Sequence, residues 1–121
     1  MASKIIGKEI PFSVIFKDET FILIGIEEYF LYENGARTDK HAGFKYEVVD
    51  TLTFDKIKVK IEGQKKPLMS PDDLTKLREN GEKIIVEFLN GVDKLYSHKD
   101  GNSWSVEDSF SAEDILLVTS E

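Results

Sequence analysis

The chain has 121 residues, of which 40% are hydrophobic and 11% aromatic, a composition typical of a folded protein and too apolar for general disorder. This length suits one domain, residues 1–121, with no room for a second core. The absence of cysteine excludes disulfides, thiolate metal sites and a cysteine nucleophile, and the net charge of −7 argues against a uniformly basic nucleic-acid binder.

Charge is unevenly distributed along the chain. Residues 37–66 contain eight Lys or Arg against five Asp or Glu, whereas the segments before and after are both acidic. A basic middle between acidic flanks favours oriented association with a charged partner. The first ten residues do not resemble a signal peptide, and the longest apolar run, residues 21–26, is far shorter than the roughly 20 residues of a membrane-spanning helix. We therefore expect a soluble cytoplasmic protein without membrane contact.

The N-terminal part of the chain predicts β-structure. Residues 12–16 and 21–26 are rich in β-branched and aromatic side chains and are separated by four polar residues, which indicates a hairpin. Gly25 within the second segment indicates a bulge, after which residues 29–32 continue the strand. A helix over residues 20–33, ended by Asn34-Gly35, is the competing interpretation, because the apolar residues are too continuous for periodicity to exclude it.

The basic middle predicts two strands after a loop. Residues 34–42 are polar and are expected to form a mobile loop. Residues 44–49 alternate between apolar and charged side chains, as a half-buried strand does. Residues 54–63 give the clearest signal, because successive side chains of a strand point to opposite faces. This segment would bury one row of side chains and expose another: Ile57, Val59 and Ile61 against Lys56, Lys58 and Lys60.

One short helix is predicted after the second of these strands. Ser70 has the side chain of an N-cap, Pro71 suits the first helical position, and Asp72 and Asp73 complement the positive end of the helix dipole. Leu74 and Leu77 give the helix a narrow apolar stripe, and Asn80-Gly81 ends it.

The C-terminal part predicts a hairpin and a closing strand. Asn90-Gly91 between residues 83–89 and 92–97 is typical of a type I′ turn, which would place Glu87 opposite Lys94 and Val86 opposite Leu95. Residues 99–102 indicate a further turn, residues 111–114 a single helical turn, and residues 115–118 the last strand. The whole order predicts a mainly β fold, a small OB-like antiparallel barrel with one short helix before a C-terminal hairpin.

No pattern in the chain indicates catalysis. His41 and His98 stand in polar segments without the spacing of a metal site, and no phosphate-binding glycine loop or nucleophile motif is present. Adjacent carboxylates on a strand point to opposite faces and do not make a catalytic pair. We therefore expect no enzymatic activity, no metal and no cofactor.

The basic residues are candidates for a contact surface. They suit either a protein partner, which we favour because of the net negative charge, or a single-stranded nucleic acid, whose bases could stack on nearby aromatic rings. The candidate binding residues are Arg37, Lys40, Lys45, Tyr46, Lys56, Lys58, Lys60, Lys65 and Lys66.

The acidic residues support a different hypothesis, in which carboxylates imitate nucleic-acid phosphates and occupy the basic channel of a nuclease. Such an inhibitor, of an anti-CRISPR or anti-restriction type, needs no catalytic residue. The candidate acidic contact surface consists of Asp72, Asp73, Glu107, Asp108, Glu113 and Asp114.

Five short sequence motifs follow one another along the chain, at residues 35–38, 43–48, 57–61, 83–88 and 111–115. In this order, over residues 33–118, the chain resembles a family of small accessory proteins carried by conjugative transposons and plasmids of Gram-positive bacteria. The resemblance implies a non-catalytic accessory role in DNA processing during replication or transfer, including support of a helicase. Mobile elements also carry inhibitors of host nucleases, so the hypothesis of acidic mimicry stays open.

Overall fold

The computed structural model describes residues 8–17 and 19–118, and one mixed sheet of eight strands accounts for most of these residues. The mainly β prediction is confirmed. The strand order is β1-β6-β7-β4-β3-β2-β5-β8, so the sheet has two ends and its closure into a barrel stays a prediction. The elements are β1 (Glu9–Pro11), α1 (Phe12–Ile15), β2 (Thr20–Glu33), β3 (Ala36–Asp50), β4 (Lys56–Glu62), α2 (Pro71–Glu79), β5 (Ile85–Leu89), β6 (Val92–Asp100), β7 (Ser103–Ser111) and β8 (Asp114–Leu117).

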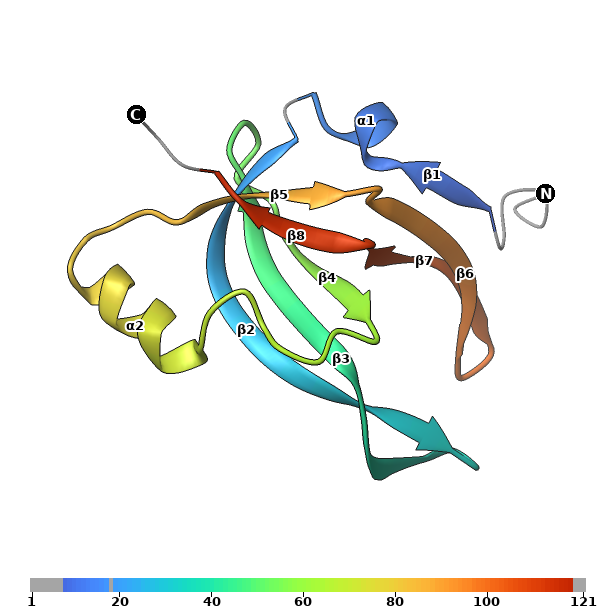
Figure 1. Cartoon of the computed structure of the whole chain (residues 1–121). Coiled ribbons are helices and arrows are strands. Elements are labelled where there is room, and N and C mark those ends of the chain that lie inside the picture. Colours follow the sequence, from blue (N-terminus) through green and yellow to red (C-terminus); the bar gives the residue numbers. More distant parts are fainter. Residues whose placement is uncertain (1–7, 18, 119–121) are drawn as a thin grey trace.

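Strands β2, β3 and β4 form an antiparallel meander in which β2 and β3 extend well beyond β4 (Figure 1). The strand interpretation of residues 20–33 is confirmed, and the predicted mobile loop over residues 34–42 is wrong. Asn34 and Gly35 both have positive φ, 53° and 77°, and make a two-residue turn. Residues 36–42 are polar because they belong to the protruding end of a hairpin, where most side chains face solvent.

Two glycines shape this meander. The pairing of β2 with β3 shifts between Leu23 and Gly25, which confirms the predicted bulge. Gly43 lies opposite Tyr29, and a Cβ atom at this position would overlap the carbonyl oxygen of Ile61 on β4. Only glycine therefore lets β3 approach β4 so closely.

The predicted N-terminal hairpin is wrong, because residues 12–15 form the short helix α1 instead of a strand. The Phe16 N–H donates to the Phe12 carbonyl at 2.8 Å, and the two rings lie edge to face at 5.2 Å. Phe12 is 1% exposed and also packs edge to face on Phe21, Phe88 and Phe110. Burial of these rings therefore outweighs the β-propensity of the segment. Asp18, in the predicted turn, lies outside the described residues.

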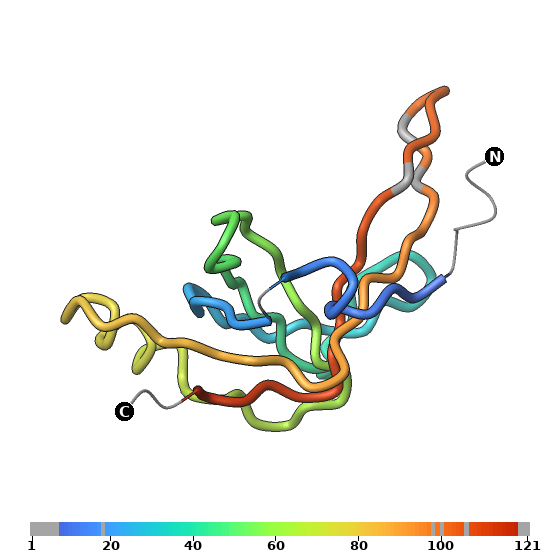
Figure 2. The backbone as a smooth tube through the Cα atoms, turned by 90° about the horizontal axis from the view of Figure 1, so that it is seen from above, coloured from blue at the N-terminus to red at the C-terminus, as the bar shows by residue number. Residues whose placement is uncertain are grey.

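The C-terminal strands make one long, bent hairpin, with β5 and β6 on one side and β7 and β8 on the other. A single register runs from Val86 opposite Leu117 to Asp100 opposite Ser103, and the chain reverses at residues 101–102. The turn predicted for residues 99–102 is thus confirmed. Figure 2 shows the β6–β7 end of this hairpin extending away from the rest of the protein.

The turn predicted at Asn90-Gly91 is wrong, and so is its register. Glu87 lies opposite Leu116 and Lys94 lies opposite Ser109, whereas Asn90-Gly91 only bends the strand between β5 and β6. Of the pair, only Asn90 has a positive φ, and a type I′ turn requires two. Gly91 is needed for another reason: a Cβ atom there would overlap the ring of Phe12.

The single helical turn predicted over residues 111–114 is also wrong. Ala112 donates its N–H to the carbonyl of Lys60, and Glu113 donates to that of Leu89. Because these N–H groups bond to neighbouring strands, the segment bends between β7 and β8 without coiling. The predicted closing strand is confirmed as β8.

Helix α2 confirms the capping prediction. The Ser70 Oγ accepts a hydrogen bond from the Asp73 N–H at 3.0 Å, and Leu74 is buried. The Arg78 guanidinium donates to the carbonyl of Ile24 at 2.9 Å and fixes the helix to β2. Strand β4 likewise confirms its predicted alternation, because Val59 and Ile61 are in the core and Lys56, Lys58 and Lys60 are exposed, whereas Ile57, predicted to be buried, is only half-buried. No helix among the described residues is long and apolar enough to span a membrane.

Candidate binding cleft

The lysine face of β4 continues onto β3. Lys45 of β3 lies directly opposite Lys60 of β4, and Glu47 lies opposite Lys58. The Lys58 amine also lies 3.4 Å from a carboxylate oxygen of Glu27 on β2, whereas neither Lys45 nor Lys60 takes part in an ion pair within the described part of the chain. Like charges directly opposite each other across two strands are unfavourable. The Lys45–Lys60 pair therefore presents two unneutralised ammonium groups side by side.

Tyr29 of β2 supports both of these lysines. Each amine lies 5.7 Å from the centre of the Tyr29 ring, within the range of a cation–π interaction. The ring lies against Gly43, where the missing side chain leaves space for it. Burial, and then the charge of Glu62, raises the pKa of the Tyr29 hydroxyl above its usual range, so this side chain is neutral at physiological pH.

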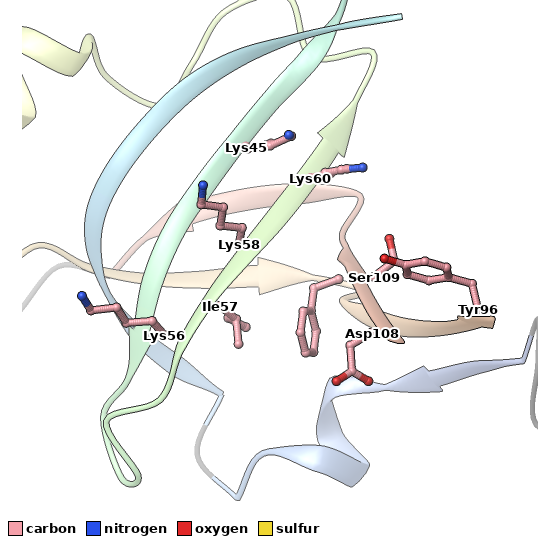
Figure 3. A pocket seen from close by; sticks show the side chains of 9 residues that line it. Lys45, Lys56, Ile57, Lys58, Lys60, Tyr96, Asp108 and Ser109 are labelled. Carbon is pink, nitrogen blue, oxygen red and sulfur yellow. The ribbon is translucent and has the colours of Figure 1, made fainter. Parts of the chain in front are cut away.

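A cleft of about 380 Å³ lies between this basic face and the β6–β7 hairpin. Four lysines and one carboxylate line it, so its formal charge is positive although the protein is acidic. Figure 3 shows Lys45 and Lys60 on the same side of the sheet, with Tyr96 across from Lys60 and Asp108 pointing away toward β1. The lining residues are Lys45, Lys56, Ile57, Lys58, Lys60, Tyr96, Asp108, Ser109 and Phe110.

Four of the nine predicted binding residues meet in this cleft, namely Lys45, Lys56, Lys58 and Lys60. Arg37 and Lys40 lie on the β2–β3 hairpin, where Arg37 stacks 4.5 Å above the Phe30 ring and Lys40 pairs with Glu33 at 3.1 Å. The remaining two lysines, Lys65 and Lys66, are exposed in the loop after β4 and do not line the cleft.

Tyr46 does not belong to the contact surface, and its predicted role there is wrong. Its side chain is completely buried, its hydroxyl donates to the Gln64 side chain at 2.6 Å, and it accepts from the Leu68 N–H at 3.0 Å. Burial raises the pKa of this hydroxyl above its usual range. Tyr46 therefore holds the loop after β4 against the core.

His41 connects the β2–β3 hairpin to the same loop. Its two ring nitrogens lie 2.6 Å from a carboxylate oxygen of Glu28 and 2.6 Å from the carbonyl of Gln64. Both partners accept, so a ring that satisfies both must carry two protons. The Gln64 carbonyl, followed by the Glu28 carboxylate, raises the pKa of His41 above its usual range. The side chain of His98 lies outside the described residues.

The six predicted acidic residues do not form one surface. Asp72 and Asp73 are in the first turn of α2, on the opposite side of the protein from β7 in both whole-chain views (Figures 1 and 2). Glu107 and Asp108 are adjacent on β7 and point to opposite faces. Glu113 accepts a hydrogen bond from the Asn90 amide, and Asp114 accepts from the Ile115 N–H.

Asp93 is a buried carboxyl group that interacts with the exposed Asp108 of the cleft, and sequence reasoning missed Asp93. Asp93 of β6 is 5% exposed, and its Oδ1 atom has no hydrogen-bond partner within the described residues. Burial, followed by a hydrogen bond with Asp108 and the charge of Asp108, raises the pKa of Asp93 to about 6, while the Ser109 N–H opposes the shift. The Asp93 carboxyl therefore changes from neutral to charged as the pH rises through about 6.

We expect Asp93→Asn to stabilise the protein at pH 8. A raised pKa in the folded state contributes stability that is complete below the unfolded pKa of 3.8 and is lost as the pH rises through about 6. A neutral amide retains this stability, so the gain at pH 8 is about 1–3 kcal/mol and disappears near pH 4. Thermal unfolding between pH 4 and 8 measures it. Glu107→Gln, a neighbouring change on β7, should show no such pH dependence, and an equal gain for both variants would contradict the assignment.

Tyr29 and Tyr96, two aromatic residues beside the lysines, are also missing from the predicted site, as is Phe110. The sequence does predict a strand at Tyr29. Recognising residues 34–35 as a hairpin turn would have paired this strand with residues 36–50 and so placed Tyr29 near Lys45. No local signal places Tyr96, because its position depends on the bend at Asn90-Gly91 and on the packing of Gly91 against Phe12.

The described residues contain no group of three or more His, Asp or Glu side chains that could hold a metal ion. In comparisons with known proteins, neither a family model, nor a curated protein, nor a solved structure matches the chain. The resemblance to accessory proteins of mobile elements thus stays a prediction, and the arguments for a function come from the cleft.

Proposed function

We propose that the chain is a non-catalytic binding module that acts in nucleic-acid-processing machinery, with the lysine-lined cleft as its contact surface. The observation that carries this proposal is the concentration of four lysines in one cleft of a protein whose net charge is −7. Exposed lysines that face a shared cavity, two of them directly opposite each other, favour a ligand or partner with closely spaced negative charges. The accessory role for a helicase or a replication or transfer protein is the one that the resemblance implies.

We further propose an OB-like arrangement of the strands. Its support is the meander β2-β3-β4, the helix α2 between β4 and β5, and the parallel pairing of β4 with β7. The chain continues from β7 into β8, which pairs with β5, and β5 pairs with β2. In OB folds the exposed face of the second and third strands binds the ligand, and here that face belongs to β3 and β4.

Acidic mimicry of nucleic acid has less support. A mimic needs several carboxylates on one surface, and the six candidates are divided among α2, β7, the bend before β8 and the first residue of β8. Of these, Asp108 faces β1 and interacts with Asp93. Inhibition of a nuclease is therefore the alternative function, and capture of a nuclease alone from a host lysate would support it.

The test is capture of partners from a host lysate by the tagged protein, with proteins identified by mass spectrometry. We expect a helicase or replication protein to be captured by the wild type and lost when Lys56, Lys58 and Lys60 are all changed to Glu. The matched control changes Lys65, Lys66 and Lys83 to Glu, because these lysines are exposed and lie outside the cleft. Equal loss with both variants, no captured nucleic-acid enzyme, or capture of a nuclease alone would overturn the accessory role.

A further inference from the structure

From the geometry of the cleft we infer that its ligand is a single strand of nucleic acid, with a phosphate between Lys45 and Lys60 and a base stacked on Tyr96. This inference rests on the proposed function and names the chemistry of the ligand for the same cleft. It is carried by three features: an unneutralised lysine pair, an exposed ring across from it, and the size of the space between them.

The lysine pair supplies the phosphate site. Lys45 and Lys60 lie opposite each other on adjacent strands, neither takes part in an ion pair among the described residues, and each lies over the Tyr29 ring. The two ammonium groups already repel each other in the folded protein. An anion placed between them is attracted to both and relieves this repulsion. On one side of this pair Glu47 lies opposite Lys58, which is neutral overall, and on the other side Glu62 lies opposite Gly43, so neither neighbouring pair offers such a site.

Tyr96 supplies the surface for a base. It stands on β6, lines the cleft, and lies across from Lys60 in Figure 3. Tyr96 is 43% exposed although it lines a cavity, so part of its ring is accessible to a flat apolar group. A protein segment with clustered carboxylates would use the lysines and leave this ring without a role. A nucleotide uses both, because its base stacks and its phosphate carries the charge.

The form of the ligand follows from the same features. Bases in a duplex are stacked on one another, and their faces are closed to a tyrosine ring, whereas those of a single strand are free. A cleft of about 380 Å³ between the basic face and the β6–β7 hairpin also suits a short segment of one strand better than a duplex. The net charge of −7 keeps non-specific attraction low, so binding depends on the cleft and falls steeply with salt.

The experiment measures fluorescence anisotropy of a labelled 12-mer of thymidylate with the purified protein, over a series of salt concentrations beginning at 50 mM. We expect saturable binding, and weaker binding of a 12-base-pair duplex. Changing Lys45 and Lys60 to Gln should reduce the slope of log K against log salt by about 0.7, because the two lysines share one phosphate contact. Changing Tyr96 to Ala should weaken binding about 5- to 150-fold with little change in slope.

Two controls separate the cleft from general effects. Changing Lys65 and Lys66 to Gln removes the same charge outside the cleft, and Trp104→Leu removes an exposed ring that stacks with Lys99 near the tip of the same hairpin. Both should bind like the wild type, and circular dichroism verifies that every variant is folded. Equal effects of control and cleft variants, equal binding of duplex, or no binding at 50 mM salt would overturn the inference. If no oligonucleotide binds while lysine-dependent capture from lysate persists, this inference fails and the proposed function stands.

Discussion

Replacing Phe12 with alanine should lower the free energy of unfolding by about 3–5 kcal/mol, the range for truncating a buried aromatic side chain. Phe12 is 1% exposed and lies edge to face against four other phenylalanine rings, so a cavity at this point has several walls that cannot all collapse. Since a small domain has a total stability of about 5–15 kcal/mol, much of the margin would be lost. Denaturation in guanidinium chloride, followed by circular dichroism, measures the change.

The control for this substitution is Val14→Ala in the same helix, because Val14 is 72% exposed and should change stability by no more than about 0.5 kcal/mol. A loss below 1 kcal/mol for Phe12→Ala would show that α1 is not part of the core. The packing against Gly91 adds a second test. Gly91→Ala should destabilise the wild type, yet cost less when residue 12 is already alanine, because the overlap is with the Phe12 ring.

Gly43→Ala should lower the free energy of unfolding by about 2–4 kcal/mol, because it overpacks the sheet rather than removing a contact. The added Cβ atom would overlap the Ile61 carbonyl oxygen, which is backbone and can move only if β3 and β4 separate, and it would also press on the Tyr29 ring at 3.0 Å. Separation of these strands moves Lys45 from Lys60 and Tyr29 from both. The variant should therefore lose stability and weaken ligand binding in the cleft together.

Gly25→Ala is the matched control for Gly43. Gly25 lies on the neighbouring part of β2, opposite Glu47, and a Cβ atom there would stay 3.4 Å from the nearest atoms of Glu47. We expect a change below about 1 kcal/mol at this position. Chemical denaturation of the two variants, side by side, measures both. Similar losses at the two positions would show that the close approach of β3 to β4 does not decide the cost at Gly43.

The elements that sequence reasoning predicted correctly depend on local physics. Strand β4 has one buried face and alternates perfectly, so Val59 and Ile61 identify the core side without knowledge of their neighbours. Helix α2 begins at Pro71, directly after its N-cap Ser70, because the cap and the acidic first turn are contained in adjacent residues. The four lysines of the cleft were found for the same reason. Tyr46 could also have been assigned correctly, because it shares a face with the buried Val48.

The errors occur where distant residues decide the local structure. The chain contains two Asn-Gly pairs after β-rich segments, and only Asn34-Gly35 makes a hairpin turn. Asn90-Gly91 bends because Phe12 lies against it, and this contact joins parts of the chain that no local pattern connects. Tyr96 was missed for the same reason. The bend at Asn90-Gly91 lets β5 and β6 continue as one side of a long hairpin, and this hairpin places Tyr96 beside the lysines.

The strand order has a consequence for the speed of folding. Three ladders join segments that are far apart in the chain: Phe21 pairs with Val86, Val59 with Phe110, and Ile10 with Asp93. Each ladder can form only after a long loop has closed, and the chain entropy lost in closing it is offset only by the contacts made afterwards. Folds dominated by such pairings take about milliseconds to seconds to form. The hairpin of β6 and β7 is exempt, because its partners are neighbours in sequence. It can therefore form on the microsecond scale, before the sheet that later holds it beside the lysines.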